Sequence, residues 1–252
     1  MTNATLFYEF PARGYLEKYY GTMGPENVAF VRSIADYVAA RATPTDTVIE
    51  VAGGPSLYSL LALMAGRRRP FGHVTFTDIG WKNLREVRSW LDDGPGQFDY
   101  GALLEWLARH AGVDGAELAA ALRASDWELV EFDWHEPVPP AWRHAYDVVS
   151  CHFFAESATS DEDDLVAFIG RLGELGRPGA TLLTSFITHS SGYRIHGRDF
   201  PAFGIDERSV LHYLEQAGIE LCDVELRSVA AQAPDADPGY DGLLFVAGRF
   251  AD

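Results

Sequence analysis

The sequence contains little of what several functional classes require. It has two cysteines, Cys151 and Cys222, and no CxxC-type spacing, so a cysteine-based metal site is not expected. Both thiols lie in apolar, strand-like runs, and we expect them to be buried and unpaired. An apolar run of membrane-spanning length is missing, and so is a basic start followed by an apolar segment. We therefore expect a soluble, cytoplasmic protein without a membrane partner and without a bound metal.

Basic side chains are also scarce. Twenty Lys and Arg stand against 37 Asp and Glu, which gives a formal net charge of −17. Such a chain is not suited to neutralising a phosphate backbone, so nucleic acid is excluded as a partner. The length of 252 residues and a hydrophobic content of 47% predict one domain with a full core. We expect a small-molecule ligand, and a monomer or a weak homodimer.

One stretch organises the rest of the chain. A β-branched run from Thr47 to Val51 predicts a buried strand, and an apolar run, 57–65, predicts a helix. Between them lies the turn Ala52-Gly53-Gly54-Pro55. Glycine permits positive φ and a close approach of ligand to backbone, and proline suits a first helical turn. The helix N-terminus is expected to offer free N–H groups to an anion such as a carboxylate.

Acidic residues end the next two predicted strands. His73–Asp78 ends in an acid placed to bind ribose hydroxyls, with Asn83 in the helix that follows, and 128–133 ends at Asp133. A fourth strand, 147–152, leads into a loop, 153–157. Strand–helix alternation predicts a doubly wound, mostly parallel sheet, whose ligands bind at the carboxyl ends of the strands.

The remaining segments are predicted as follows. Residues 1–46 form an N-terminal lid and a helix from Glu26 to Ala42, and 98–126 form an inserted helical segment. The acids 161–164 begin a helix, where the helix dipole explains them better than a metal does. Residues 188–204 form a loop inserted near the substrate, and Asp206 caps a helix to Ala217. The last three strands are expected at 180–186, 220–226 and 243–250, which makes seven.

Three cofactors compete for the glycine turn. The turn lacks GxxxxGK[ST], which excludes a P-loop. A dehydrogenase would carry GxGxxG, but Ala52, Gly54 and Leu57 stand at the corresponding positions. S-adenosylmethionine needs a close-approach turn, a ribose-binding acid and an adenine acceptor. Gly53-Gly54, Asp78 and Asp133 meet these three needs.

Several motifs together resemble the nicotinamide / phenylethanolamine / indolethylamine-thioether methyltransferase family. They are Tyr15-Leu16-Glu17-Lys18-Tyr19-Tyr20, the stretch 49–58 with Gly-Pro-Ser-Leu-Tyr, Thr77-Asp78 with Asn83-Leu84, Trp90-Leu91, Gln97-Phe98-Asp99-Tyr100, Asp133, Arg177-Pro178-Gly179, Ser190-Ser191 and Gly242-Leu243. The resemblance implies a Rossmann-like class I methyltransferase fold of the α/β class, with N-terminal and inserted covering helices. It also implies methylation of a small molecule.

The resemblance further implies roles for individual residues. The residues it assigns to the cofactor are Tyr15, Tyr20, Ala52, Gly53, Gly54, Tyr58, Asp78, Asn83, Asp133, Trp134 and Cys151. Those assigned to the substrate are Tyr8, Tyr19, Phe154, Glu156, Phe186, Ser190, Tyr193 and Arg194. Glu156 and Tyr20 are the catalytic candidates, since Glu156 could orient an ammonium or accept its proton and aromatic faces could surround a sulfonium.

Departures from the family leave the acceptor open. Ala52 stands where the first glycine is usual, Phe186 where nicotinamide enzymes have an aspartate, and Ser190 where the phenylethanolamine pocket has a second acid. We expect methylation at nitrogen, in an amine or an N-heteroaromatic. The alternatives are O-, S- or C-methylation of a small carboxylated or aromatic metabolite, whose carboxylate Arg194 or Arg198 could recognise, and a non-catalytic protein that only binds the cofactor.

Overall fold

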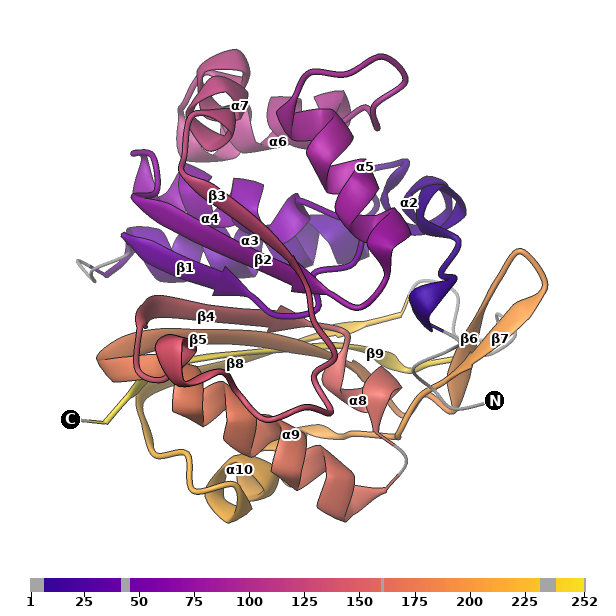
Figure 1. The fold of residues 1–252 in the computed structure, drawn as a ribbon, viewed down its shortest axis with the longest axis vertical. Coiled ribbons are helices and arrows are strands. Elements are labelled where there is room, and N and C mark those ends of the chain that lie inside the picture. Colours follow the sequence, from indigo (N-terminus) through magenta and orange to yellow (C-terminus); the bar gives the residue numbers. More distant parts are fainter. Residues whose placement is uncertain (1–6, 42–45, 160, 232–238, 252) are drawn as a thin grey trace. The chain divides into compact units, whose positions relative to one another are not determined.

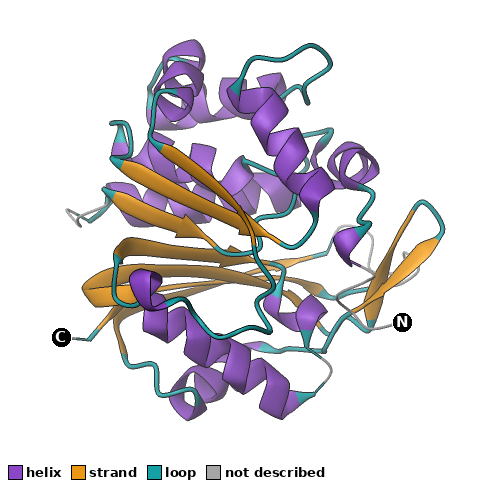
Figure 2. Ribbon diagram, viewed as in Figure 1, coloured by secondary structure: helices purple, strands orange, loops and turns teal. Residues whose placement is uncertain are grey.

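Two runs of strand–helix alternation make up the computed structural model, which describes residues 7–41, 46–159, 161–231 and 239–251. They form two compact units, Met1–Phe132 and Asp133–Asp252. The strands belong to a seven-stranded sheet of order β3-β2-β1-β4-β5-β9-β8, and a separate pair is formed by β6 and β7. Figures 1 and 2 show the ribbon.

The first unit holds three parallel strands and most of the helices. Its elements are α2 (Ala12–Tyr20), α3 (Pro25–Ala39), β1 (Thr47–Glu50), α4 (Tyr58–Arg67), β2 (His73–Asp78), α5 (Trp81–Leu91), α6 (Gly101–Ala111), α7 (Gly115–Arg123) and β3 (Trp127–Glu131). Val48 is in register with Val74, and Phe76 with Leu129. β1 and β2 are buried along most of their length, as expected for parallel strands covered on both faces, and the buried residues include the polar Thr75 and Thr77.

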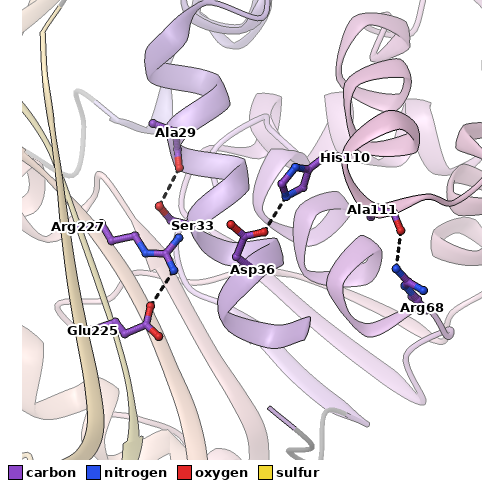
Figure 3. A network of polar contacts seen from close by, with 8 residues as sticks. All are labelled: Ala29, Ser33, Asp36, Arg68, His110, Ala111, Glu225 and Arg227. Atoms are coloured by element: carbon purple, nitrogen blue, oxygen red, sulfur yellow. Dashed lines mark hydrogen bonds and ion pairs between the residues drawn. The ribbon is translucent and has the colours of Figure 1, made fainter. Parts of the chain in front are cut away.

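Helices of the first unit pack in two groups. α4, buried from Tyr58 to Ala65, lies against α3, α6 and α7, whereas α5 packs on β2 and β3 and contacts α2. Figure 3 shows His110 of α6 pointing at Asp36 of α3, with Nε2 2.7 Å from Oδ1. In the same view, Arg68 donates to the carbonyl of Ala111 at the end of α6. These contacts attach the helices of 98–126 to those around the glycine turn.

The second unit mixes parallel and antiparallel pairing. Its elements are the 3-10 turn η1 (Pro140–Trp142), β4 (Tyr146–His152), α8 (Ala155–Ala158), α9 (Glu162–Leu175), β5 (Gly176–Thr188), β6 (Gly192–Ile195), β7 (Arg198–Pro201), α10 (Glu207–Gln216), β8 (Leu221–Ala230) and β9 (Gly242–Phe250). β4 pairs with β5 in parallel, and β9 lies antiparallel between β5 and β8. Figure 1 shows α9 and α10 together on one side of these strands.

Several predicted boundaries are confirmed. The second strand spans His73–Asp78 as expected. Asp161 is the N-cap of α9 and accepts a hydrogen bond from the Asp164 amide, and Asp206 caps α10 by accepting from Ser209 N–H. An N-cap acid satisfies amides that have no partner inside the helix. None of the described helices has both the length and the apolar character that crossing a membrane requires.

Several other predicted boundaries are wrong. β5 begins at Gly176, not Ala180, because Gly176 pairs with Tyr146 and the chain stays extended through Pro178. The predicted loop 153–157 contains the single helical turn α8. The predicted loop 188–204 contains the β6–β7 hairpin, whose tip residues, His196 and Gly197, both have positive φ. Such a two-residue tip matches the right-handed twist of paired strands.

The second cysteine also corrects the sequence prediction. Cys151 is buried in β4, but Cys222 is exposed. Cys222 lies on β8, the last strand of the sheet, where the register with β9 shifts between Cys222 and Glu225. Asp223 inside this irregularity has a φ of 54°. An edge strand with a bulge exposes side chains that alternation alone would bury.

Candidate functional site

The glycine turn is built from residues with unusual backbone angles. After β1 the chain passes through Ala52 with a φ of 48° and Gly54 with a φ of 63°. A Cβ on Gly53 would lie 2.4 Å from Cζ of Phe76, whereas a Cβ on Gly54 would meet nothing within 4 Å. Gly53 is therefore required by packing, and Gly54 by its backbone angle. The space above Gly54 leaves its backbone open to a ligand.

Ala52 adopts a positive φ although it has a Cβ, and this conformation costs stability. We expect Ala52→Gly to raise the free energy of unfolding by about 1 kcal/mol, because glycine adopts positive φ without the clash that Cβ causes. Urea titration at fixed pH measures the change. The matched control is Ala65→Gly in the buried, regular helix α4, which should lose about 1 kcal/mol. An Ala52→Gly protein less stable than wild type would contradict the role assigned to this angle.

Asp78 ties the turn to the end of β2. Its Oδ2 accepts from the Gly54 amide at 2.9 Å, and its Oδ1 accepts from the Gly80 amide at 2.6 Å and from Nδ2 of Asn83 at 2.9 Å. Burial raises the pKa of this carboxyl to about 6, and the three hydrogen bonds oppose the rise. Oδ1 of Asn83 is buried and has no hydrogen-bond partner among the described residues. Ala52, Gly53, Gly54, Asp78 and Asn83 are thus brought together.

A cluster of tyrosine rings lies in the same unit. The rings of Tyr15 and Tyr20 are 5.7 Å apart, and those of Tyr20 and Tyr58 are 4.6 Å apart. The Tyr58 hydroxyl donates to the carbonyl oxygen of Tyr20 at 2.8 Å. Burial is the main cause that raises the pKa of Tyr20, to about 12, so this phenol stays protonated at neutral pH. Tyr19 lies 5.0 Å from Tyr15, centroid to centroid, and the side chain of Tyr8 is exposed.

The start of α4 differs from the expectation that it offers free amides. The Leu57 amide donates to the Tyr100 hydroxyl at 3.0 Å, and the Tyr58 amide donates to Oγ of Ser56 at 3.2 Å. Both groups are buried, where an N–H without an acceptor is costly. Two of the first amides of this helix are therefore already used by the protein's own side chains.

Glu156 is the most unusual carboxyl of the second unit. It lies in α8, and its side chain is fully buried. Oε1 accepts from the Ile187 amide of β5 at 2.8 Å, whereas Oε2 has no hydrogen-bond partner among the described residues. Burial raises the pKa of this carboxyl to about 8, and the Ile187 amide opposes the rise. A solvated loop acid is therefore excluded.

The predicted adenine residues follow β3. Asp133 accepts from the His135 amide at 2.9 Å through Oδ1, which is also 2.8 Å from Nδ1 of the His135 ring. Trp134 is buried, and its ring lies 6.1 Å from that of Trp142 and 6.5 Å from that of Phe168. The sequence placed Asp133 in a strand, but β3 ends at Glu131. Asp133 is instead the first residue of a turn closed by the Glu136 amide.

Three of the predicted acceptor residues lie in β5, at the start of α8 and in the turn after β5. Phe186 is buried in β5, and Phe154, at the start of α8, packs edge-on to Phe168 at 5.3 Å. Ser190 is buried, and its hydroxyl donates to the Gly192 carbonyl and accepts from the Gly192 amide. The hydroxyl is therefore used within its own turn and does not replace an acid.

The β6–β7 hairpin carries two more of them. Tyr193 stacks on Phe200 with centroids 5.1 Å apart and an interplanar angle of 13°. Nε of Arg194 lies 2.5 Å from Oδ1 of Asp199, which pairs with it across the hairpin. Arg194 is thus committed to an exposed ion pair within the hairpin, which weakens its assignment to a substrate carboxylate.

Two polar groups outside the predicted site residues, Glu50 and His152, are prominent in the structure. Glu50 ends β1 and is buried, and its charge is among the causes that raise the pKa of Tyr20. Its place at the end of an apolar strand was the available signal. His152 ends β4, between the hydroxyls of Ser150 at 3.0 Å and Ser185 at 2.9 Å. Burial lowers the pKa of His152 to about 3, so the imidazole is neutral.

Known proteins extend the resemblance over the whole chain. Residues 1–249 match the NNMT/PNMT/TEMT family. The chain is 26% identical over 251 residues to indolethylamine N-methyltransferase of Mus musculus, covering 96% of this chain and 93% of that protein. It is 25% identical over 230 residues to nicotinamide N-methyltransferase of Homo sapiens, covering 85% and 83%.

Solved structures agree on the fold. The N-methyltransferase NodS from Bradyrhizobium japonicum, solved with S-adenosyl-L-homocysteine, superposes with a TM-score of 0.55 at 11% identity, covering 99% of this chain and 97% of that chain. This likeness confirms the Rossmann-like class I methyltransferase fold predicted from the sequence. The chain belongs to the NNMT/PNMT/TEMT family and is an S-adenosylmethionine-dependent methyltransferase.

Proposed function

We propose that this enzyme methylates a nitrogen atom of a small amine or N-heteroaromatic molecule. The named relatives are N-methyltransferases of indolethylamine and of nicotinamide, which supports nitrogen as the acceptor atom. The observation that carries the proposal is Glu156, a fully buried carboxyl with one oxygen bound to the Ile187 amide and the other without a partner among the described residues. A buried oxygen of this kind gains most from a cationic or N–H donor.

The first unit fits the cofactor. Asn83 presents a buried amide oxygen that still needs a donor, and the space above Gly54 admits a ligand. We assign Asp78 and Asn83 to the ribose hydroxyls. Tyr15, Tyr20, Ala52, Gly53, Gly54 and Tyr58 are assigned to the methionine portion. Bound there, S-adenosylmethionine supplies an electrophilic methyl group.

In the second unit, Asp133, Trp134 and Cys151 are assigned to the adenine. Asp133 is fixed by its hydrogen bond from His135, and Trp134 and Cys151 are buried. A carboxylate held in this way is suited to accept hydrogen bonds from an exocyclic amino group.

Glu156 would act on the acceptor. Its pKa is raised to about 8, so in the free enzyme at neutral pH the group is mostly the neutral acid. A bound ammonium would favour the carboxylate, which could then take the proton that an amine nitrogen must lose. The aromatic residues Tyr8, Tyr19, Phe154, Phe186 and Tyr193 are assigned to the acceptor with Glu156, and Tyr20 to the reacting methyl group. Arg194, in the β6–β7 hairpin, and Ser190, in the turn before it, would shape the acceptor region without binding a charged group of the acceptor.

The proposal also includes the domain roles and the setting. Residues 1–46 would act as a lid, 98–126 as an inserted cover and 188–204 as a substrate-determining insertion of one methyltransferase domain. Residues 1–6 and 42–45 of the lid lie outside the described residues. The net charge of −17 favours a monomer or weak homodimer without a nucleic-acid partner, and the cytoplasm is the proposed location.

A binding experiment tests the cofactor assignment. We expect S-adenosylmethionine and its demethylated product to bind in the presence of a chelator, because the assigned residues are carboxylate, amide and backbone groups rather than a metal cluster. Titration calorimetry with EDTA measures the affinity. Transfer of labelled methyl to a panel of aralkyl amines, pyridine-type heteroaromatics and aromatic acids then identifies the acceptor class. The absence of binding at millimolar ligand would contradict the cofactor assignment, and methylation of acids alone would contradict the nitrogen assignment.

A further inference from the structure

Tyr100 reaches the glycine turn from the helical segment 98–126. It is the N-cap residue of α6 and is buried. Its ring packs edge-on against Phe98 at 4.9 Å and Trp90 at 5.6 Å, and lies 5.8 Å from the ring of Tyr58. These neighbours hold the ring in one place, because an aromatic side chain enclosed by other rings has little rotamer freedom.

The hydroxyl of Tyr100 bonds to the turn on both sides of Ser56. It accepts from the Leu57 amide at 3.0 Å and donates to the Pro55 carbonyl at 3.3 Å. A hydroxyl has one proton and two lone pairs, so both bonds are satisfied by a single group. Burial raises the pKa of this phenol, and the donor proton is therefore kept throughout the neutral range.

Packing by itself does not require this hydroxyl. A phenylalanine ring would make the same contacts with Trp90, Phe98 and Tyr58. The hydroxyl adds two hydrogen bonds that hold the backbone from Pro55 to Leu57 in place, next to the open backbone of Gly54. Gly54 itself is held from the other side by Asp78. The turn is thus fixed at both ends by side chains before any ligand arrives.

We propose that Tyr100 is a positioning residue for the cofactor, acting through its hydroxyl on the backbone of residues 55–57. This inference rests on the proposed assignment of the Ala52–Tyr58 stretch to the cofactor. A turn that is already ordered does not lose conformational freedom on binding, so more of the contact energy appears as affinity. The segment 98–126 would then be part of the cofactor-binding apparatus and not only a cover.

The experiment compares Tyr100→Phe with wild type. We expect the Kd and the KM of S-adenosylmethionine to rise about tenfold, as the loss of one or two buried hydrogen bonds implies. The KM of the acceptor found by the panel and kcat at saturating cofactor should stay within about twofold. Tyr100 is assigned no contact with the acceptor or with the transferred methyl group. The matched control is Tyr37→Phe, which removes a phenolic hydroxyl from another buried ring of the first unit, on α3. It should change thermal stability without changing cofactor affinity.

A second measurement does not depend on the cofactor. Amide hydrogen exchange should show the Leu57 N–H protected in wild type and in Tyr37→Phe, and exposed in Tyr100→Phe. If Tyr100→Phe does not fold, a fast-exchanging Leu57 amide in the wild-type protein contradicts the fastening, and a protected one supports it.

The outcomes separate the two proposals. Wild-type protein that does not bind S-adenosylmethionine overturns the cofactor assignment and this inference with it. Wild-type binding combined with an unchanged Kd for Tyr100→Phe overturns only the positioning role. A rise in Kd that Tyr37→Phe shares also overturns it, because the effect would then follow general loss of stability.

Discussion

Asp78→Ala is expected to weaken the binding of S-adenosylmethionine about tenfold to a hundredfold. A carboxylate that accepts ribose hydroxyls contributes about 1.5–3 kcal/mol, as hydrogen bonds to charged groups do. The structure adds a second effect, because Asp78 also holds the amides of Gly54 and Gly80. We therefore expect some loss of stability as well. Titration calorimetry measures the affinity, and thermal unfolding measures the stability.

Asp114→Ala is the matched control for this variant. Asp114 is the N-cap of α7 and accepts from the amides of Ala116 and Glu117 at 2.8 and 2.9 Å. Its removal should cost about 1 kcal/mol of stability and leave cofactor affinity unchanged. If Asp78→Ala behaves in the same way, Asp78 is a backbone anchor only.

The pKa of Asp78 sets a direction with pH. Its folded pKa is raised from 3.8 to about 6, so its contribution to stability is fully present below pH 3.8 and is lost as pH rises through about 6. Ligand binding depends on pH in the opposite direction, because hydroxyls donate more strongly to the ionised carboxylate, which forms as pH rises. Cofactor affinity should therefore increase between about pH 5 and 7 in wild type and should not do so in Asp78→Ala.

Glu156→Gln is expected to lower the affinity for a cationic acceptor about 30- to 300-fold, and its turnover with it. The substitution keeps the shape and the acceptor for the Ile187 amide but cannot form the carboxylate that a bound cation favours. Breaking one partner of a buried ion pair costs about 2–5 kcal/mol, and the lower part of this range applies because a hydrogen bond to the amide oxygen remains. Steady-state kinetics on an amine from the acceptor panel measures the change.

The stability of Glu156→Gln relative to wild type should increase with pH. The folded pKa of Glu156 is raised from 4.5 to about 8, so the contribution of this group is fully present below pH 4.5 and is lost as pH rises through about 8. Glutamine does not ionise. The difference between the thermal midpoints of Glu156→Gln and wild type should therefore shift in favour of the variant as pH rises from 5 to 9.

Two controls accompany Glu156→Gln. Asp147→Asn alters another buried acid of the second unit, paired with Arg177 at 3.0 Å, and should reduce stability without changing acceptor kinetics. Arg194→Ala tests whether the acceptor is a carboxylate held by Arg194. It should have little effect on the kinetics, since Arg194 pairs with Asp199. An amine acceptor whose KM and kcat ignore Glu156→Gln would defeat the role given to Glu156, and damage by Arg194→Ala would favour an acid.

Local rules predicted the features that depend on near neighbours. Asp161 and Asp206 were expected to begin helices because an acid before an apolar run satisfies the first amides, and both do. The strand His73–Asp78 was readable from its β-branched and aromatic run. The family motifs, which combine local chemistry over the whole chain, led to a fold and an enzyme class that the comparisons confirm.

Features set by distant pairing could not be predicted in this way. Cys222 was expected to be buried, but exposure depends on β8 being an edge strand, which follows from the order of the whole sheet. The hairpin tip at His196-Gly197 was missed because asparagine or aspartate before glycine is the usual signal. The Leu57 amide appeared free because its acceptor, Tyr100, lies 43 residues further along the chain.

The turn around Ala52 and the β6–β7 hairpin differ in how freely their sequences can change during evolution. The turn around Ala52 is bound to Thr77, Asp78 and Tyr100, so one mutation there disturbs several partners and selection should tolerate few. The hairpin satisfies itself through Tyr193 on Phe200 and Arg194 with Asp199. The hairpin sequence can therefore change in coordinated pairs of residues, whereas a change in the turn has to remain compatible with several partners at once. If the hairpin contacts the acceptor and the turn contacts the cofactor, as proposed, changes in the hairpin would alter acceptor preference while S-adenosylmethionine binding is kept.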